Sequence, residues 1–180
     1  MNKLIKIKIW ATIGIFIISF ISHFIYIIFP NIITSILFPV NESIFEHMKI
    51  IFTSTIIYSI IDYILLKKEN ISTDNFWIQL LLTSFLGIII YLILYLPIRY
   101  TIGEYLPISI LLLFITYTIM QIVSYYLLAK EKIPYPNKLT ILLIIIIYII
   151  FAILTYNPPH NDLFLDTSTS TYGINPLTKK

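Results

Sequence analysis

The sequence predicts an all-α protein, a polytopic membrane helix bundle with five transmembrane spans. Hydrophobic residues make up 58% of the 180-residue chain and charged residues only 12%, whereas a soluble domain carries about 25% charged residues. The mean hydropathy is +0.91. Because so few charged groups cannot cover the surface of a globular protein in water, we expect most of the exterior to face lipid.

Five apolar runs, separated by prolines and polar clusters, define the predicted spans. A helix needs about 20 residues to cross about 30 Å of hydrocarbon. A secretory signal would have an apolar core of only about 7–15 residues. The first run is longer than that and ends at Pro30, so we expect it to be an uncleaved span. The predicted spans are residues 9–29, 46–66, 76–96, 105–128 and 139–156.

The same prolines and polar clusters define the connections between the spans. Residues 32–40 form a short apolar connector, either re-entrant or lying at the membrane interface. Asp74 or Asn75 can cap the third span. Residues 97–104 form a loop that holds Arg99, the single arginine. The remaining predicted connections are the turn at 67–75, the loop at 130–138 and a polar tail at 157–180.

The distribution of positive charge predicts the orientation. If the N-terminus is inside, the inner segments carry eight lysines, whereas the outer segments carry Lys49, Arg99, Lys179 and Lys180. Lysine and arginine favour the cytoplasmic side. We therefore expect a multi-pass cell-membrane protein with a cytoplasmic N-terminus and, after five spans, an extracytoplasmic C-terminus. The inner lysines are Lys3, Lys6, Lys8, Lys67, Lys68, Lys130, Lys132 and Lys138.

Composition also restricts the chemistry and the partners. The chain has no cysteine, which excludes disulfides, thiolate metal sites and cysteine nucleophiles. The expected partner is the lipid bilayer, together with either a second copy of the chain or a membrane partner protein. No nucleic acid is expected.

Residues 39–49, Pro-Val-Asn-Glu-Ser-Ile-Phe-Glu-His-Met-Lys, form the densest cluster of ionisable groups. Helix initiation explains much of it: Asn41 is a good N-cap, acidic residues suit a helix start, and Val40 with Phe45 can form a hydrophobic staple. Alternatively, the spacing of Ser43 and Glu46 predicts a capping box with Ser43 as the N-cap. Glu46 can also pair with Lys49 at the i+3 position.

The same residues have a functional interpretation. Glu42 and Glu46 are expected one turn apart on one helix face, with His47 beside them. Two carboxylates and an imidazole can bind a divalent metal, which is the candidate cofactor, or act as acid and base, with Glu46 and His47 as the candidate catalytic pair. No His-Glu-x-x-His spacing is present. The candidate metal ligands are Glu42, Glu46, His47, His23 and His160.

Polar residues elsewhere complete the expected outer site. Ser19, Ser22 and His23 fall on one helix face, which we expect to point into the bundle. The tail is expected to fold over the outer face with Phe164 and Tyr172 as anchors. The further polar residues assigned to this site are Asn41, Lys49, Arg99, Glu104, Asp162, Asp166, Tyr172 and Gly173.

Two pairings of acidic residues are also expected. Asp166 of the tail can pair with Arg99 or Lys49. Asp62 lies about 24 Å along its helix from Glu46, and it is expected to extend toward Lys67 or Lys68 at the inner end in a structural role.

Residues 41–49, following Pro39-Val40, resemble the signature of a family of small prokaryotic integral membrane proteins catalogued as a domain of unknown function. In that signature the run reads Asn-Glu-Ser-(Ile/Val)-aromatic-Glu-His-(Leu/Met)-Lys, and Phe45 stands where tryptophan is expected more often. The tail is also similar, in Pro158-Pro159, Phe164, Asp166 and residues 171–174. The resemblance covers essentially the whole chain.

The resemblance implies a multi-span fold but no known activity. It implies that one set of residues forms the characteristic surface of the family, namely Asn41, Glu42, Glu46, His47, Lys49, Asp166, Tyr172 and Gly173. The sequence is compatible with three functions: a metal-dependent hydrolase embedded in the membrane, a transporter for a small solute or ion, and a non-catalytic partner subunit. A transporter would need continuous polarity from His47 to Asp62.

Overall fold

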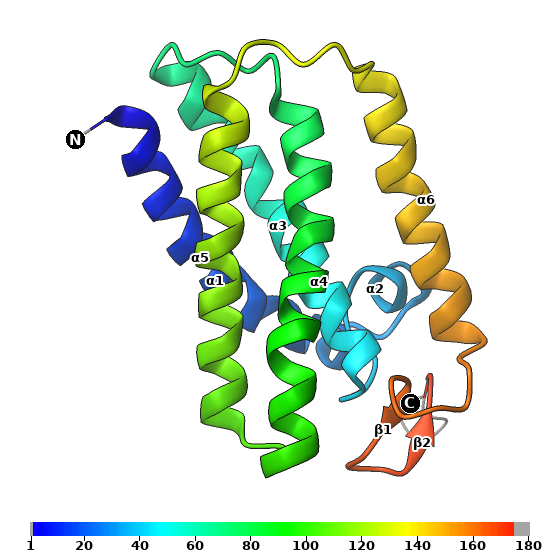
Figure 1. Ribbon diagram of the computed structural model, residues 1–180. Helices are drawn as coiled ribbons and strands as arrows, with labels where there is room; N and C mark the ends of the chain where they lie inside the picture. The colour runs from blue at the N-terminus through cyan, green and yellow to red at the C-terminus, as the bar shows by residue number, and fades with distance from the viewer. Residues whose placement is uncertain (1, 175–180) are drawn as a thin grey trace.

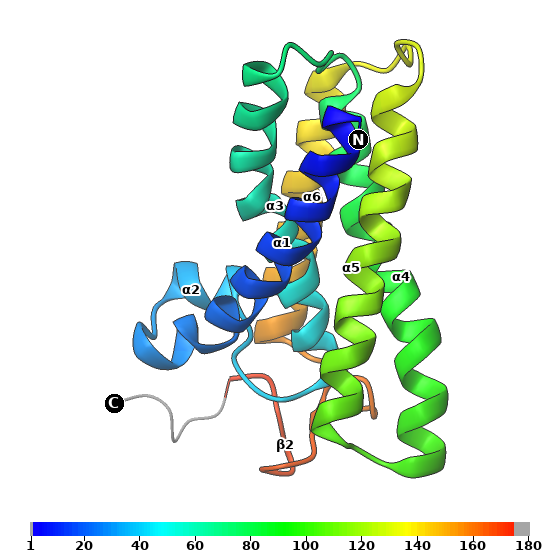
Figure 2. The same ribbon diagram turned by 90° about the vertical axis from the view of Figure 1, so that its left-hand side faces the viewer.

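Five long helices, one short helix and a two-stranded hairpin make up the part of the chain that the structure describes (Figures 1 and 2). The computed structural model describes residues 2–174. The five long helices have lengths and mean hydropathies, from 1.6 to 2.9, that allow each to cross a membrane. The predicted all-α, five-span membrane fold is therefore confirmed. The helices are α1 (Lys3–Ile28), α2 (Ile32–Leu37), α3 (Ile44–Lys68), α4 (Phe76–Ile102), α5 (Leu106–Ala129) and α6 (Asn137–Tyr156).

Two helices, α1 and α4, extend farthest beyond their predicted spans. α1 begins at Lys3 because the side chain of Asn2 caps it, accepting a hydrogen bond from the Leu4 amide at 3.0 Å. α4 continues through Pro97 to Ile102, so the loop predicted at 97–104 is wrong over most of its length. Proline removes one hydrogen-bond donor but has a φ angle that suits a helix, so a spanning helix can contain it. α4 ends at Gly103, whose φ angle is +92°.

α3 is the central helix of the bundle. In its most apolar segment 56% of the residues are buried, compared with 22% in α6. α1 packs closely on α3, because a Cβ atom added at Gly14 would lie 2.1 Å from the ring of Tyr58. α6 stands at the edge in Figure 1 and is joined to α3 by aromatic side chains: Phe52 lies 5.3 Å from Tyr148 and 5.5 Å from Phe151 between ring centroids.

The bundle has two distinct ends. One end carries the start of α1 and the connections after α3 and α5, at the top of Figure 1; we call it the lysine-rich end. The other end carries a short antiparallel hairpin of β1 (Leu165–Asp166) and β2 (Thr171–Tyr172), in which Leu165 pairs with Tyr172. We call it the hairpin end.

The hairpin segment rests on the start of α3. The ring of Phe164 lies 4.6 Å from that of Phe45 between centroids. The amide of Phe45 donates a 2.9 Å hydrogen bond to the carbonyl of Leu163, and the side chain of Asn41 donates one of 2.8 Å to the carbonyl of Gly173. The last part of the predicted tail, residues 175–180 with Lys179 and Lys180, lies outside the described residues.

Large apolar side chains cover much of the bundle surface. Trp10 on α1, Leu106 on α5 and Ile153 on α6 are 57%, 71% and 56% exposed. Side chains of this kind are unfavourable in water, and their spread over several helices suits a lipid bilayer.

Candidate functional site

Ser43, not Asn41, caps α3. The Ser43 side chain accepts a hydrogen bond from the Glu46 amide, whereas Asn41 accepts one from the Ser43 amide at 2.9 Å. Ser43 is therefore the N-cap, but the predicted capping box is only half formed, because the Ser43 amide donates to Asn41 and not to Glu46. Glu42 consequently lies before the helix, so the expectation that Glu42 and Glu46 share one helical face is wrong.

This start brings three potential metal ligands together. His23 near the end of α1, Glu42 before α3 and His47 in the first turns of α3 each offer a ligand atom, and these atoms all lie within 4.8 Å of one another. The Nε2 atom of His23 lies 3.4 Å from one oxygen of Glu42, and the Nε2 atom of His47 lies 3.6 Å from the other. We call His23, Glu42 and His47 the histidine cluster.

The backbone fixes the orientation of His47. Its Nδ1 atom lies 2.9 Å from the carbonyl oxygen of Ser43. A carbonyl can only accept, so Nδ1 carries the proton and, in the neutral imidazole, Nε2 keeps its lone pair. The lone pair is therefore directed toward Glu42 and His23, as in metal-binding histidines that donate from their other nitrogen.

Glu42 provides a negative charge in the cluster. A hydrogen bond with His23 lowers the pKa of the Glu42 carboxyl below its usual value, and burial opposes this shift. The Glu42 side chain is about half exposed, at 47%. An ionised, accessible carboxylate beside two imidazoles is a donor set that suits a divalent transition metal.

An apolar cavity of about 250 Å³ adjoins the two histidines. It lies between α1, α3, α4 and α5. Polar groups occupy only part of its wall, through His23, His47, Ser19, Ser109 and the ring of Tyr91; the remaining wall residues are apolar, namely Phe20, Phe24, Ile50, Leu106, Ile110 and Leu113.

Glu46 lies outside the histidine cluster. The residue is 1% exposed, and its carboxylate contacts Lys49 at 2.5 Å, the Val40 amide at 2.9 Å and the Thr155 hydroxyl at 3.1 Å. Lys49 in turn donates to the carbonyl of Ser35 at 2.8 Å. This buried pair joins α2, α3 and α6. The expected pairing of Glu46 with Lys49 is confirmed, but the structure does not bring Glu46 beside His47 as a ligand or base.

Most other residues expected at the site also have separate partners. His160 lies against the ring of Tyr172, 4.5 Å between centroids. Arg99 pairs with Glu104 at 3.0 Å. Asp166 accepts hydrogen bonds from Ser168 and Thr169, so its expected pairing with Arg99 or Lys49 is wrong. Residues of the same short turn supply the hydrogen bonds to this carboxylate, so it needs no cation from another part of the chain. Asp162 is exposed.

Comparison with known proteins gives a family. The model of a family of unknown function, DUF6512, matches residues 1–174. The chain belongs to DUF6512. No curated protein and no solved structure matches the chain.

This DUF6512 chain also contains a buried ion pair that sequence reasoning missed. Asp62 of α3 pairs at 2.5 Å with Lys8 of α1, and both residues are 4% exposed. The expected extension of Asp62 toward Lys67 or Lys68 is wrong, because Asp62 faces α1. The depth of the two residues in the membrane could have revealed the pair. Lys8 lies five residues after the start of α1 and Asp62 six residues before the end of α3, so the two are at a similar distance from the same end of the bundle.

Proposed function

We propose that the protein is a membrane-embedded metal-dependent hydrolase that holds one divalent ion between His23, Glu42 and His47. The observation that carries this proposal is the convergence of three ligand atoms from two helices and a connector to within 4.8 Å of one another. Three protein ligands leave a position open for water or substrate, which is typical of catalytic rather than structural zinc sites.

A metal ion here would supply Lewis-acid chemistry, by polarising a substrate oxygen and lowering the pKa of a bound water. The chain supplies the rest. The Ser43 carbonyl orients His47, and Glu42 supplies the negative charge that two neutral imidazoles lack. Arg99 lies at the same end of the bundle but is already paired with Glu104.

The adjoining cavity indicates the substrate class. Its wall is apolar except beside the two histidines and a few hydroxyl groups. A molecule with a polar head at the cluster and an apolar chain in the cavity fits this wall, because binding pockets pair an apolar lining with a few convergent polar groups. The substrate class is therefore an amphiphile of the membrane.

We further propose that the histidine cluster lies on the extracytoplasmic face of a prokaryotic cell membrane. The lysine-rich end carries Lys3, Lys67, Lys68, Lys130 and Lys132 at helix ends and in connections. Such residues favour the cytoplasm. The prokaryotic source is inferred from the resemblance of residues 41–49 to the signature run.

Metal content tests the proposal. Wild-type protein is purified in detergent after growth with zinc, manganese and iron and compared by elemental analysis with His23→Ala/His47→Ala. His160→Ala is the matched control, because it removes the third histidine of the chain, which lies outside the cluster. We expect close to one metal ion per chain in the wild type and control, and none in the double variant at equal thermal stability.

Two results would contradict the proposal: a wild type that stays free of metal after incubation with each ion, or a double variant that retains as much metal as His160→Ala.

A further inference from the structure

The carboxylate of Asp62 is only half satisfied. Its Oδ2 atom accepts a hydrogen bond from the ammonium group of Lys8 at 2.5 Å. Its Oδ1 atom is fully buried and accepts no hydrogen bond from any residue in the described range 2–174. A buried carboxylate oxygen without a partner is unfavourable. This oxygen therefore indicates a site for a ligand.

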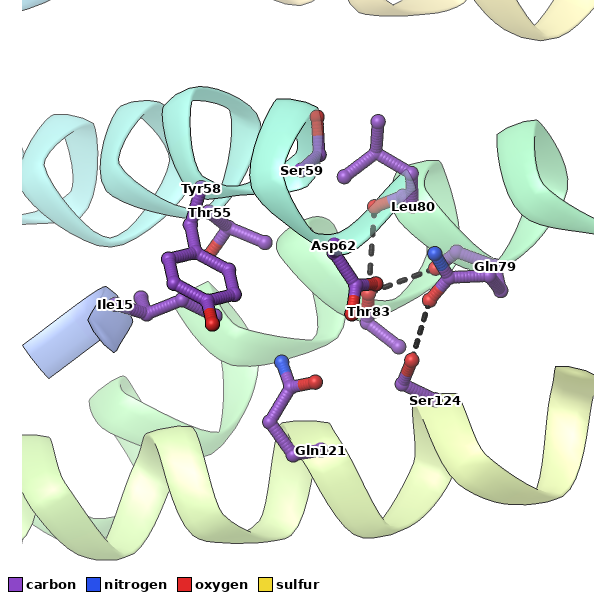
Figure 3. Close-up of a pocket in the computed structure, with 10 residues that line it drawn as sticks. All are labelled: Ile15, Thr55, Tyr58, Ser59, Asp62, Gln79, Leu80, Thr83, Gln121 and Ser124. Atoms are coloured by element: carbon purple, nitrogen blue, oxygen red, sulfur yellow. Dashed lines mark hydrogen bonds between the residues drawn. The ribbon is translucent and has the colours of Figure 1, made fainter. Parts of the chain in front are cut away.

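Asp62 lines a small cavity between α1, α3, α4 and α5, shown in Figure 3. The volume of the cavity is about 10 Å³, which is room for one particle about the size of a water molecule. Figure 3 shows Asp62, Gln121 and Thr83 pointing into the space between the helices. The ligand is thus a single water molecule or a single small ion.

Hydroxyl oxygens with engaged protons form part of the wall of the cavity, which also includes the side-chain amides of Gln79 and Gln121. Thr55 donates its hydroxyl proton to the carbonyl of Ile51, Ser59 to that of Ile56 and Thr83 to that of Gln79. These hydroxyl groups therefore present lone pairs rather than protons to the cavity. Together with Oδ1 of Asp62 they form an oxygen-rich wall, and hard cations such as Na⁺ prefer oxygen ligands of this kind.

Charge balance decides how a cation can bind. Lys8 already neutralises Asp62, and an additional positive charge in this buried place would be uncompensated. The charge balances if the Lys8 ammonium group releases one proton to water as the cation enters, leaving a neutral amine and one cation on the Asp62 carboxylate. Lysine is suited to this step because its charge state responds readily to burial.

A route connects Lys8 with the surface. A crevice of about 400 Å³ between α1 and α5 is lined by Lys8, Thr12 and Gln121, with Ile5, Ile9, Thr118, Ile122, Tyr125 and Tyr126. Gln121 borders both this crevice and the small cavity at Asp62. The other titratable groups facing the pair are Tyr58 of α3 at the cavity and Tyr125 and Tyr126 of α5 at the crevice; the lining residues from α4 do not titrate.

We propose that Asp62 binds one sodium-sized monovalent cation in this cavity in exchange for the proton of Lys8. The site lies in the half of the bundle toward the lysine-rich end, apart from the histidine cluster. It does not depend on the metal-dependent activity proposed for that cluster.

Ligand-dependent stability tests the site. The thermal unfolding of the purified full chain in detergent is measured in sodium chloride, potassium chloride and choline chloride at equal ionic strength. Ligands that bind only the folded state raise its stability in a saturable way. We expect sodium to raise the Tm by at least ~2 °C at saturation relative to choline, and potassium, which is larger, to raise it less.

Variants locate the effect. Asp62→Asn should abolish the sodium-dependent rise, and the milder Thr83→Val should weaken it. Asp74→Asn, which changes an exposed aspartate in the connection between α3 and α4, should retain it. If Asp62→Asn does not fold, Thr83→Val and the wild-type comparison of sodium with choline decide the question.

Proton release tests the exchange. Sodium added to weakly buffered wild-type protein should release about one proton per cation bound, a stoichiometry set by the charge balance at the Lys8–Asp62 pair. Equal Tm values in sodium and choline would overturn the proposal and assign the cavity to water. An undiminished sodium effect in Asp62→Asn or Thr83→Val, or sodium binding without proton release, would overturn it as well.

Discussion

At the scale of single residues, Glu42 supplies the carboxylate of the histidine cluster, and we propose it as a metal ligand. Glu42→Gln removes this charge and keeps the shape, so metal affinity should fall by more than about tenfold. Thermal stability should change little because the side chain is half exposed. The measurement is a metal titration in competition with a chromophoric chelator. An unchanged affinity would exclude Glu42 as a ligand.

Glu46 and Lys49 should behave in the opposite way. Removing one partner of a buried ion pair leaves an uncompensated charge, so Glu46→Ala should lower the free energy of unfolding by about 3–5 kcal/mol. Lys3→Ala breaks the exposed pair of Lys3 with Glu69 and should have no measurable effect. Chemical unfolding in detergent compares the two variants. Equal stability of Glu46→Ala and the wild type would show that the pair is dispensable.

At the scale of elements, the hairpin is held partly by Asp166. Burial raises the pKa of its carboxyl, but hydrogen bonds from Ser168 and Thr169 outweigh this and place the pKa below its usual value. Asp166→Asn should therefore loosen the hairpin by about 1 kcal/mol, giving roughly fivefold faster proteolysis at neutral pH. Asp162→Asn, at an exposed position, is the control.

The sign of the pKa shift gives a pH dependence. A carboxyl whose pKa is lower in the folded state stabilises that state above the unfolded pKa of about 3.9. This stabilisation is lost as the pH falls through the lower folded-state pKa. The difference in hairpin opening between wild type and Asp166→Asn, followed by hydrogen exchange, should therefore disappear in strong acid. A difference that persists there would contradict this role for Asp166.

At the scale of the whole molecule, the absence of cysteine from the sequence allows a direct test of orientation. Asp162→Cys at the hairpin end should react with a membrane-impermeant thiol reagent in intact cells, because we place that end outside. Lys68→Cys at the lysine-rich end should react only after permeabilisation. The reversed labelling pattern would invert the proposed orientation.

The five spans were predictable because composition and run length alone determine which segments suit lipid. The end of α4 was not predictable, because a proline usually indicates the end of a helix, whereas α4 continues through Pro97. Contacts between side chains of different helices were the hardest feature to predict from the sequence. The sequence places His23 and Asp62 on helix faces, but it does not say that Glu42 lies beside His23, or Lys8 beside Asp62.

The pairing of Lys8 with Asp62 also bears on how the chain enters a bilayer. Inserted singly, α1 would bring an unpaired cation and α3 an unpaired anion into the membrane, each costing up to about 2.5–3.5 kcal/mol at mid-depth. Their contact pairs these two buried charges with each other. The buried charge of the first helix is therefore paired with a residue synthesised 54 positions later, and we expect the two helices to integrate as a unit during biosynthesis.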